Sequence, residues 1–315
     1  MALTSRTVKD PAAVRPRQAQ SWLRGARFRR TVLPWLFILP ITSLHLLVVV
    51  GPSLSGLYYS LTEWSGYGPA KFVGLENFRK LFFEDMTFRQ AFRHNLFWLM
   101  FFVTIPVMMA LAVATLLAQV RRGGMLFRTI FFVPYVLPSV VAAFIWQVLY
   151  NPSLGVGAQL AQWGIPGLNH AFLGDKRTAL GAIAFADNWH WWGFLMILFL
   201  TAMQGIPADL YDAAKIDGAN RWQEFRNVTL PGIRPTLLFM LMMTAIWSFL
   251  VFDYVWILTQ GGPAGSSEML ATYLYKQAFN RFEAGYATAI GLTISIMAGM
   301  IVLLFTLLRR RGWEI

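Results

Sequence analysis

The sequence contains no cysteine, few charged residues and only four histidines. Without cysteine, disulfide bonds, thiolate metal ligands and cysteine nucleophiles are excluded, although the compartment stays open. Only 13% of the 315 residues are Asp, Glu, Lys or Arg, whereas soluble domains average about 25%. Together with 57% hydrophobic residues and a mean hydropathy of +0.51, this scarcity favours a lipid bilayer over water as the solvent.

Acidic residues are scarcer than basic ones, at 15 against 27 Lys and Arg, which gives a formal net charge of +12. Such an excess can indicate nucleic-acid binding, but the basic residues do not gather on an aromatic-rich face. Their distribution is instead typical of residues that set membrane topology and attract lipid headgroups. We therefore expect the lipid bilayer, and no nucleic acid, as a partner.

Motifs for ATP hydrolysis and metal catalysis are also missing. No Lys is followed by Ser or Thr, so the phosphate-binding pattern G-x-x-x-x-G-K-[ST] is absent. His45, His94, His170 and His190 are scattered without metal-ligand or nucleophile spacing. We expect no enzyme activity, catalytic residue, metal or cofactor in this chain, so energy from ATP would have to arrive through a partner.

Long apolar runs predict the fold class. A helix needs about 20 mostly apolar residues to cross the hydrocarbon core. Six segments qualify, namely 33–59, 96–118, 129–150, 179–205, 236–258 and 286–308. Buried helices of a large soluble core are the alternative, but six such lengths with so few charges argue against it. We expect an all-α polytopic membrane protein with six transmembrane helices.

The basic residues predict the orientation. With the N-terminus in the cytoplasm, 18 of the 27 Lys and Arg lie on the cytoplasmic side, which places both termini there. Residues 1–32 are then a basic cytoplasmic tail without apolar periodicity. Residues 33–315 form the transmembrane domain, with a cytoplasmic loop at 206–232. Pro134 and Pro138 in the third span predict either ordinary kinks or a helix that lines a cavity.

The loop 206–232 has the signals of two short helices separated by a break. Pro207 suits the first turn of one helix, Gly218 suits a left-handed end, and Asn220 suits the cap of the next helix. Pro231 is expected to end the unit before the fifth span. Small residues between these signals would let another protein approach closely, so the loop has the character of a docking element.

The same loop carries a family resemblance. The run Asp212-Ala213-Ala214, then Gly218, then Val228-Thr229-Leu230-Pro231 resembles the EAA loop of ABC-importer permeases. It departs from the family pattern by Asp for Glu at 212 and Val for Ile at 228, and both changes keep the side-chain chemistry. The resemblance implies that the loop inserts into a groove on an ATPase subunit, where Asp212 pairs with a basic residue. The implied coupling residues are Tyr211, Asp212, Ala213, Ala214, Asp217, Gly218, Leu230 and Pro231.

Further stretches resemble the first permease of carbohydrate importers of the maltose and glycerol-phosphate type. They are the segments 72–78, 258–263, 273–279 and 285–287. This resemblance implies the core of a type I ABC-importer permease without the large external insertion of the maltose-transporter subunit. It also implies a second, different permease subunit, two ATP-binding cassette subunits that hold ATP and Mg, and an extracytoplasmic sugar-binding protein. The implied location is the bacterial or archaeal cytoplasmic (inner) membrane.

Polar and aromatic residues near the middle of three spans are candidates for sugar contacts. Tyr135 and Ser139 are four residues apart and are expected to share a helix face. A second cluster lies at 187–194, and a third at 247–251 with Asp253 nearby. Intramembrane carboxylates usually face a cavity or a partner, whereas Trp189, Trp191 and Trp192 could form an interfacial belt, and His190 could be a satisfied polar residue.

The resemblance favours a sugar path. It implies substrate contacts at Tyr135, Ser139, Asp187, His190, Trp191, Phe194, Trp247, Ser248 and Val251. Rival functions are an ABC-importer permease for a non-sugar solute, a proton-coupled secondary transporter that uses Asp187 and Asp253, and a membrane scaffold that transports nothing. The sequence does not name the sugar.

Overall fold

The computed structural model describes residues 33–120, 122–165 and 169–308. These residues are mainly helical, which confirms the helical class, and the strands among them form one short hairpin. Its strands β1 (Thr62–Glu63) and β2 (Lys71–Phe72) are antiparallel, with Thr62 opposite Phe72. The expected tail at 1–32, Arg121 and the C-terminal arginines at 309–311 lie outside the described residues.

The chain divides into two units after Gly56. The first unit contains α2 (Leu33–His45), the π-helix η1 (Leu46–Val50) and the start of α3 (Gly51–Ser60), whose last four residues belong to the second unit. The run Leu33–Ser60 is long and apolar enough to cross a membrane. No side chain of α2 or η1 is buried. An apolar helix without protein cover is stable where lipid is the solvent, because its backbone hydrogen bonds are all internal.

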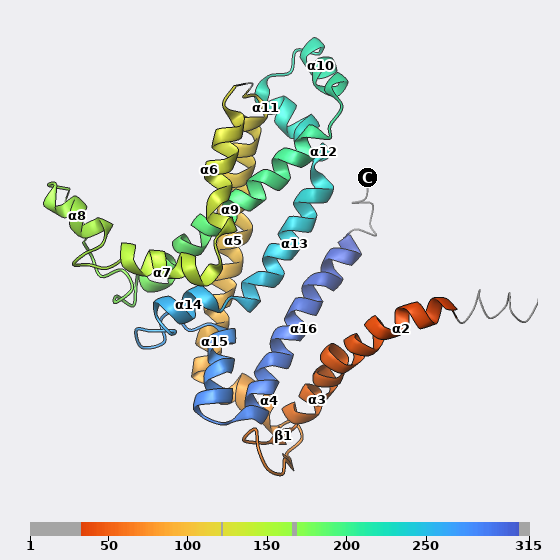
Figure 1. Ribbon diagram of the computed structural model, residues 1–315, viewed down its shortest axis with the longest axis vertical. Helices are drawn as coiled ribbons and strands as arrows, with labels where there is room; N and C mark the ends of the chain where they lie inside the picture. Colours follow the sequence, from red (N-terminus) through yellow and green to blue (C-terminus); the bar gives the residue numbers. More distant parts are fainter. Residues whose placement is uncertain (1–32, 121, 166–168, 309–315) are drawn as a thin grey trace, which may run out of the picture. The chain divides into compact units, whose positions relative to one another are not determined.

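The second unit, which begins at Leu57, holds the remaining helices (Figure 1). In chain order they are α4 (Glu76–Arg79), η2 (Lys80–Glu84), α5 (Met86–Ala118), α6 (Gly124–Val136), α7 (Ser139–Leu149), α8 (Val156–Gln162), α9 (Ala179–Gln204), α10 (Ala208–Ile216), α11 (Arg221–Glu224), η3 (Phe225–Thr229), α12 (Leu230–Gly232), α13 (Arg234–Leu250), α14 (Asp253–Leu258), α15 (Leu270–Tyr275), η4 (Lys276–Asn280) and α16 (Ala284–Leu308).

Within the described ranges, four helical runs are long and apolar enough to span a membrane: Leu33–Ser60, Met86–Ala118, Arg234–Leu258 and Ala284–Leu308. The number rises to six if each of two bent helix pairs counts as one span. The pairs are α6 with α7, bent by 97°, and α9 with α10, bent by 75°. The structure thus gives a polytopic helical protein, while the count of six spans and the side of the termini stay predictions.

The third expected span, 129–150, is broken in the middle. Leu137 is extended (φ −69°, ψ 141°), and α7 begins after Pro138. Proline disfavours the helical conformation in the preceding residue and has no N–H for the helix ladder. Tyr135 therefore belongs to α6 and Ser139 to α7, so the prediction that they share one helix face is wrong.

The fifth expected span, 236–258, also breaks, between α13 and α14. Val251 has a non-helical backbone (φ −58°, ψ 124°), and the chain resumes a helix at Asp253. Trp247 and Ser248 lie in the last turn of α13, whereas Val251 lies in the break. The three residues therefore do not share one helical face, although all three line the same cavity.

Helices α5 and α9 form the centre of the second unit, with α6 packed on α9 and α13 on α5. Trp98 from α5 and Phe199 from α9 are fully buried there. A Cβ on Gly193 of α9 would lie 1.9 Å from the backbone oxygen of Phe131 in α6, so only glycine allows this approach. Small residues commonly permit such close contacts between membrane helices.

The two ends of the second unit differ in content. Figure 1 shows the start of α6 and the helices α10–α12 at one end, and β1, α4 and α15 at the other. The connections that carry Arg122, Lys215 and Arg221 thus share an end. This arrangement agrees with the expectation that both connections face the cytoplasm.

At the opposite end, Asp85 fixes the start of α5, ten residues before the expected span at 96. Its side chain accepts a hydrogen bond from the Phe88 N–H (3.0 Å) and one each from the hydroxyls of Tyr273 and Tyr286. Burial alone would raise the pKa of the Asp85 carboxyl, but these hydrogen bonds hold its pKa below the ordinary value. Asp85 thereby ties α5 to α15 and α16.

Candidate functional site

A cavity of about 620 Å³ opens among α5, α6, α7, α9, α13 and α14. Eight of the nine expected substrate residues line it: Tyr135, Ser139, Asp187, His190, Trp191, Trp247, Ser248 and Val251. The ninth, Phe194, stands behind the wall, where its ring stacks on that of Tyr135 at 4.3 Å between centroids. The structure therefore brings together residues from three separate stretches of the sequence.

Two hydrogen bonds connect the broken helices at this cavity. Ser139 donates from Oγ to Oδ2 of Asp253, which joins the first residue of α7 to the first residue of α14. His190 donates from Nε2 to the carbonyl oxygen of Leu137 (2.9 Å), so Nε2 carries the proton. The carbonyl at the break is thereby satisfied without a helical partner, as irregular backbone in a membrane requires.

The carboxylates of Asp187 and Asp253 give the cavity an acidic character. Asp187 lies on α9 and is half-buried, and Asp253 starts α14. No Lys or Arg from the described ranges lines the cavity. The other ionisable side chains in its wall are His190, Tyr135 and Tyr254.

Aromatic rings make up much of the remaining wall. Trp191 meets Trp247 edge to face, with centroids 4.4 Å apart, and Trp98 contributes from α5. Trp191 thus belongs to the cavity wall, whereas Trp189 packs against Trp146 and Trp192 against Phe131. Flat apolar ring faces combined with a few fixed polar groups are the usual composition of a small-molecule site.

Three polar atoms of cavity-lining residues are buried and have no hydrogen-bond partner in the described part of the chain. They are Oγ1 of Thr244, Nε1 of Trp191 and the hydroxyl oxygen of Tyr254. These residues are 2%, 6% and 3% exposed. Leaving a buried polar group unpaired costs about 1–3 kcal/mol, so such atoms indicate a place where a polar ligand or water completes the bonding.

Sequence reasoning missed several lining residues, among them Trp98, Phe102, Thr244 and Tyr254. Trp98 and Phe102 lie four residues apart on α5 and share a face, but an aromatic pair at this spacing is equally typical of a core or a lipid contact. Tyr254 could have been found, because it adjoins Asp253. Asn95 could also have pointed to the cavity. It is fully buried, and its side-chain amide donates a hydrogen bond to the Ser248 carbonyl (2.7 Å), which anchors the cavity end of α13 to α5.

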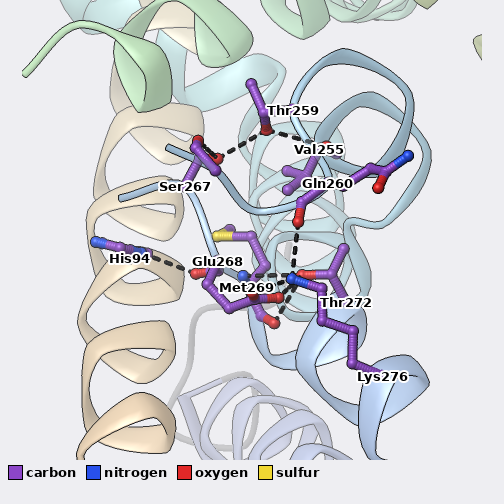
Figure 2. A network of polar contacts seen from close by, with 10 residues as sticks. His94, Val255, Thr259, Gln260, Ser267, Glu268, Met269, Thr272 and Lys276 are labelled. Atoms are coloured by element: carbon purple, nitrogen blue, oxygen red, sulfur yellow. Dashed lines mark hydrogen bonds and ion pairs between the residues drawn. The ribbon is translucent and has the colours of Figure 1, made fainter. Parts of the chain in front are cut away.

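A polar network closes the turn that follows α14, in the stretch 258–263 that resembled carbohydrate permeases. Figure 2 shows Lys276 of η4 reaching the carboxylate of Glu268 and the carbonyl of Gln260, the latter at 2.7 Å. Thr272 also donates to Glu268 (2.7 Å), and His94 of α5 donates from Nδ1 to the Glu268 carbonyl (2.8 Å). The network holds the turn after α14 against α5 and η4.

The expected docking loop consists of two helical segments separated by a glycine. Gly218 has φ +78°, the left-handed conformation expected of it. Asn220 caps α11 in a capping box with Gln223, with bonds of 3.0 and 2.8 Å. Pro231 does not end the unit, because it lies inside α12 and the helical turn continues to Gly232.

The expected coupling residues lie on this loop and are mostly exposed. Asp212, Ala213, Asp217 and Pro231 are exposed, whereas Tyr211, Ala214 and Leu230 are half-buried. Asp212 pairs with Lys215 of its own helix, at 3.0 Å. Two large apolar side chains that sequence reasoning missed, Ile216 and Trp222, are 87% and 66% exposed, which is typical of a protein-contact surface.

A helical chain with several membrane-length segments, a polar cavity among its helices and an ordered helical loop at one end has the features of a membrane transport subunit. The comparison with protein families agrees. The chain belongs to the family described as binding-protein-dependent transport system inner membrane component, whose model matches residues 103–311.

Individual relatives support this assignment. The chain is 37% identical to the probable ABC transporter permease protein YurN of Bacillus subtilis over 84% of this chain and 92% of that protein. It is 32% identical to the diacetylchitobiose uptake system permease protein NgcF of Streptomyces coelicolor, with 96% and 90% covered. A chain in the crystal structure of a bacterial ABC transporter involved in the import of the acidic polysaccharide alginate matches with a TM-score of 0.80 and 25% identity, over 93% of this chain and 99% of that one.

The comparisons confirm the predicted family and the type I ABC-importer permease fold. The chain is a permease component of a binding-protein-dependent importer. Its relatives are permease subunits and not enzymes, and the secondary-transporter and scaffold alternatives are not favoured.

Proposed function

We propose that this chain is the membrane-spanning permease subunit of an ATP-driven carbohydrate importer, and that the cavity is part of its translocation path. One observation carries the proposal: eight residues expected to contact sugar, from three separate stretches of sequence, line the same cavity. The similarity to an uptake system for diacetylchitobiose and to a transporter for a polysaccharide supports carbohydrate as the solute class.

The composition of the cavity suits a sugar. Indole and phenol rings such as those of Trp191, Trp247 and Tyr135 can cover the apolar faces of a pyranose. The carboxylates of Asp187 and Asp253 can accept hydrogen bonds from its hydroxyl groups, and charge-assisted hydrogen bonds of this kind are short and strong. We propose that this chain itself takes no cofactor and that ATP and Mg reside on partner subunits.

The position of the loop 206–232 in the chain supports a role in coupling ATP hydrolysis to this cavity. It connects α9 to α13, and both helices line the cavity. Tyr211 of α10 is hydrogen-bonded to Thr229 of η3 at 3.0 Å, so the two halves of the loop can move together. We infer that an ATPase subunit contacts Asp212 and the exposed Ile216 and Trp222, and that motion of the loop changes the angle between α9 and α13.

The proposed cycle is alternating access. ATP brings two partner ATPase subunits together, their grooves move the docking loops, and the cavity opens outward to accept sugar from an extracytoplasmic binding protein. Hydrolysis reverses the motion. Such coupling requires that ATP and sugar each bind one conformation better than the other. The breaks at Leu137 and Val251 supply hinge points in the cavity wall.

The assembly we propose contains a second, different permease subunit beside this chain and lies in a bacterial or archaeal cytoplasmic membrane. Six spans with both termini in the cytoplasm agree with the charge distribution and place the external turn 259–269 on the side of the binding protein. The exposed apolar surfaces of α2 and α16, including Phe37 and Leu304, would contact lipid or the second permease.

Complementation tests the proposal. A strain that lacks the gene would receive either the wild-type chain or Asp212→Lys, and uptake of labelled carbohydrates would be measured across a panel. We expect the wild type to restore uptake of at least one sugar and a stably inserted Asp212→Lys variant to lose it. Asp209→Lys, the same charge change on the same helix, serves as the control and should retain most of the uptake.

The possible failures differ from one another. Restoration of a non-sugar solute by the wild-type chain would contradict carbohydrate as the substrate class. Equal uptake with wild type and Asp212→Lys would show that Asp212 is not needed for coupling. Uptake that resists ATP depletion but stops with an uncoupler would support a proton-coupled transporter instead.

A further inference from the structure

The ionisable groups around the cavity are unequal in sign. Its wall carries the carboxylates of Asp187 and Asp253, and no Lys or Arg from the described residues lines it. Nε2 of His190 already donates its hydrogen bond to the Leu137 carbonyl. An anionic ligand would therefore meet acidic side chains and no Lys or Arg from the described residues.

The polar groups that are still unpaired point to an uncharged, hydroxyl-rich ligand. Thr244 and Tyr254 each have a hydroxyl, and Trp191 has an N–H, that is buried without a partner in the described chain. The hydroxyls can both donate and accept hydrogen bonds, and the indole N–H can only donate. Sugar hydroxyl groups match this mixture, because each can both donate and accept. One can accept a hydrogen bond from the indole N–H, another can bond to the hydroxyl of Thr244 or Tyr254, and a third can donate to a carboxylate.

Resting on the proposed carbohydrate function, we propose that Asp187 and Asp253 determine substrate charge: the path accepts neutral and amino sugars and rejects anionic ones such as uronates and sugar phosphates. Asp253 is held toward α7 by the hydrogen bond from Ser139, which fixes one charge in the wall. Asp187, on the neighbouring helix α9, places a second acidic group in the same wall. Alginate, the acidic polymer imported by the transporter with a similar fold, is on this account not a substrate of this chain.

Physical magnitudes favour such discrimination. Two like charges a few ångströms apart repel by several times the thermal energy at the effective dielectric of a protein. No basic side chain from the described residues lines the cavity to offset this repulsion. A neutral sugar experiences no net repulsion and donates hydrogen bonds to the same carboxylates. A protonated amino sugar gains attraction, since a cation near a carboxylate is favoured.

The test compares matched probes that differ in one charged group. The complete importer would be reconstituted in nanodiscs and titrated by calorimetry with glucose, glucuronate and glucosamine, and with the β-1,4-linked disaccharides cellobiose, cellobiouronate and chitobiose. We expect the uronate to bind at least about tenfold more weakly than the neutral member of its triplet. In the double variant Asp187→Asn, Asp253→Asn, this ratio should fall towards one.

Two further variants keep the test specific. Glu63→Gln removes one negative charge from an exposed external side chain outside the cavity and should leave the ratio unchanged. Ser139→Ala keeps both carboxylates, so it should weaken binding of the neutral sugar while the uronate stays disfavoured. Thermal unfolding of each variant shows whether the complex remains folded.

The proposal is overturned if the wild-type importer binds uronates as tightly as neutral sugars, or if the double Asn variant keeps the wild-type ratio. Failure of the proposed function would give a different result. If the wild-type importer bound no sugar of any charge and restored no carbohydrate uptake, the function as a carbohydrate importer would be contradicted.

Discussion

Ser139, the first residue of α7, donates a hydrogen bond to the carboxylate of Asp253, the first residue of α14, across 114 positions of sequence. Each residue follows a break in a membrane segment, one at Leu137–Pro138 and the other at Val251–Phe252. The two breaks therefore meet at the cavity and are joined by a charge-assisted bond. When α7 and α14 move relative to each other, this hydrogen bond either breaks or moves with both helices. Substitutions at Ser139 or Asp253 are therefore expected to affect transport.

Removing either partner of this bond should weaken transport, and the two losses should not add. A hydrogen bond to a charged group contributes about 1.5–3 kcal/mol. We expect Ser139→Ala to raise the apparent KM for uptake by roughly tenfold, and Ser139→Ala with Asp253→Asn to be little worse than Asp253→Asn alone. A double-mutant cycle on uptake kinetics measures this coupling, and strictly additive losses would contradict it.

Gly193 should tolerate no side chain, because a Cβ there would lie 1.9 Å from the backbone oxygen of Phe131. We expect Gly193→Ala to lower stability by about 1–3 kcal/mol or more, since α6 and α9 must move apart. Gly181 is the matched control on the same helix, where a Cβ would meet nothing within 4 Å. Gly181→Ala should be neutral or stabilising by up to about 1 kcal/mol. Thermal unfolding of the purified complex compares the two, and equal effects would refute the close contact.

Lys276 should be needed for stability because its partner Glu268 is only 4% exposed. Breaking one half of a buried ion pair costs about 3–5 kcal/mol, so we expect a large loss of thermal stability in Lys276→Met and partial recovery when Glu268→Gln is added. Arg79→Met is the control, because Arg79 pairs with Glu76 and Glu84 at the surface. Surface pairs contribute at most about 1 kcal/mol, and a similar loss in both single variants would contradict the distinction.

Asp85 should stabilise the junction of α5, α15 and α16 in its charged form. Burial would raise the pKa of its carboxyl, but the hydrogen bonds from Tyr273 and Tyr286 outweigh this effect. The pKa is therefore depressed in the folded chain. A depressed pKa adds stability above the unfolded value, which is about 3.9 for Asp, and that stability is lost as the pH falls through the folded value.

We therefore expect Asp85→Asn to unfold at a lower temperature than the wild type at pH 7 and equally so at pH 5. The difference should shrink only below about pH 3.9, where the unfolded carboxyl begins to take up protons. Unfolding temperatures of both proteins across this range provide the measurement. A difference that disappears already at pH 5 would mean that the Asp85 pKa is not depressed.

Much of the fold could be predicted because lipid imposes simple rules. The apolar runs located the helices, with 179–205 nearly matching α9, and Asn220 and Gly218 act in the loop as their chemistry indicates. The start of α5 was predicted too late, since residues 86–95 are polar on one side and are held by the Asp85 cap and by contacts that no local pattern reveals.

The candidate site could be predicted only in part. Its residue types in three stretches were recognisable, and those stretches do meet at one cavity. The prediction that Tyr135 and Ser139 share a helix face is wrong, because the chain breaks at Leu137 and Pro138 and the two residues belong to different helices. Trp98 and Thr244 were not found, since nothing in a single span says which of its faces meets the cavity and which meets lipid.

Because the natural chain has no cysteine, one introduced thiol tests directly whether the cavity is the translocation path. Val251→Cys would place it in the cavity wall, and Ser295→Cys on the exposed surface of α16 would be the control. The complete importer would be treated with a positively charged, membrane-impermeant methanethiosulfonate in the nucleotide-free and vanadate-trapped states. We predict that Val251→Cys reacts at clearly different rates in the two states and loses uptake on modification, while Ser295→Cys does not. Complete modification of Val251→Cys with unchanged uptake would contradict the account.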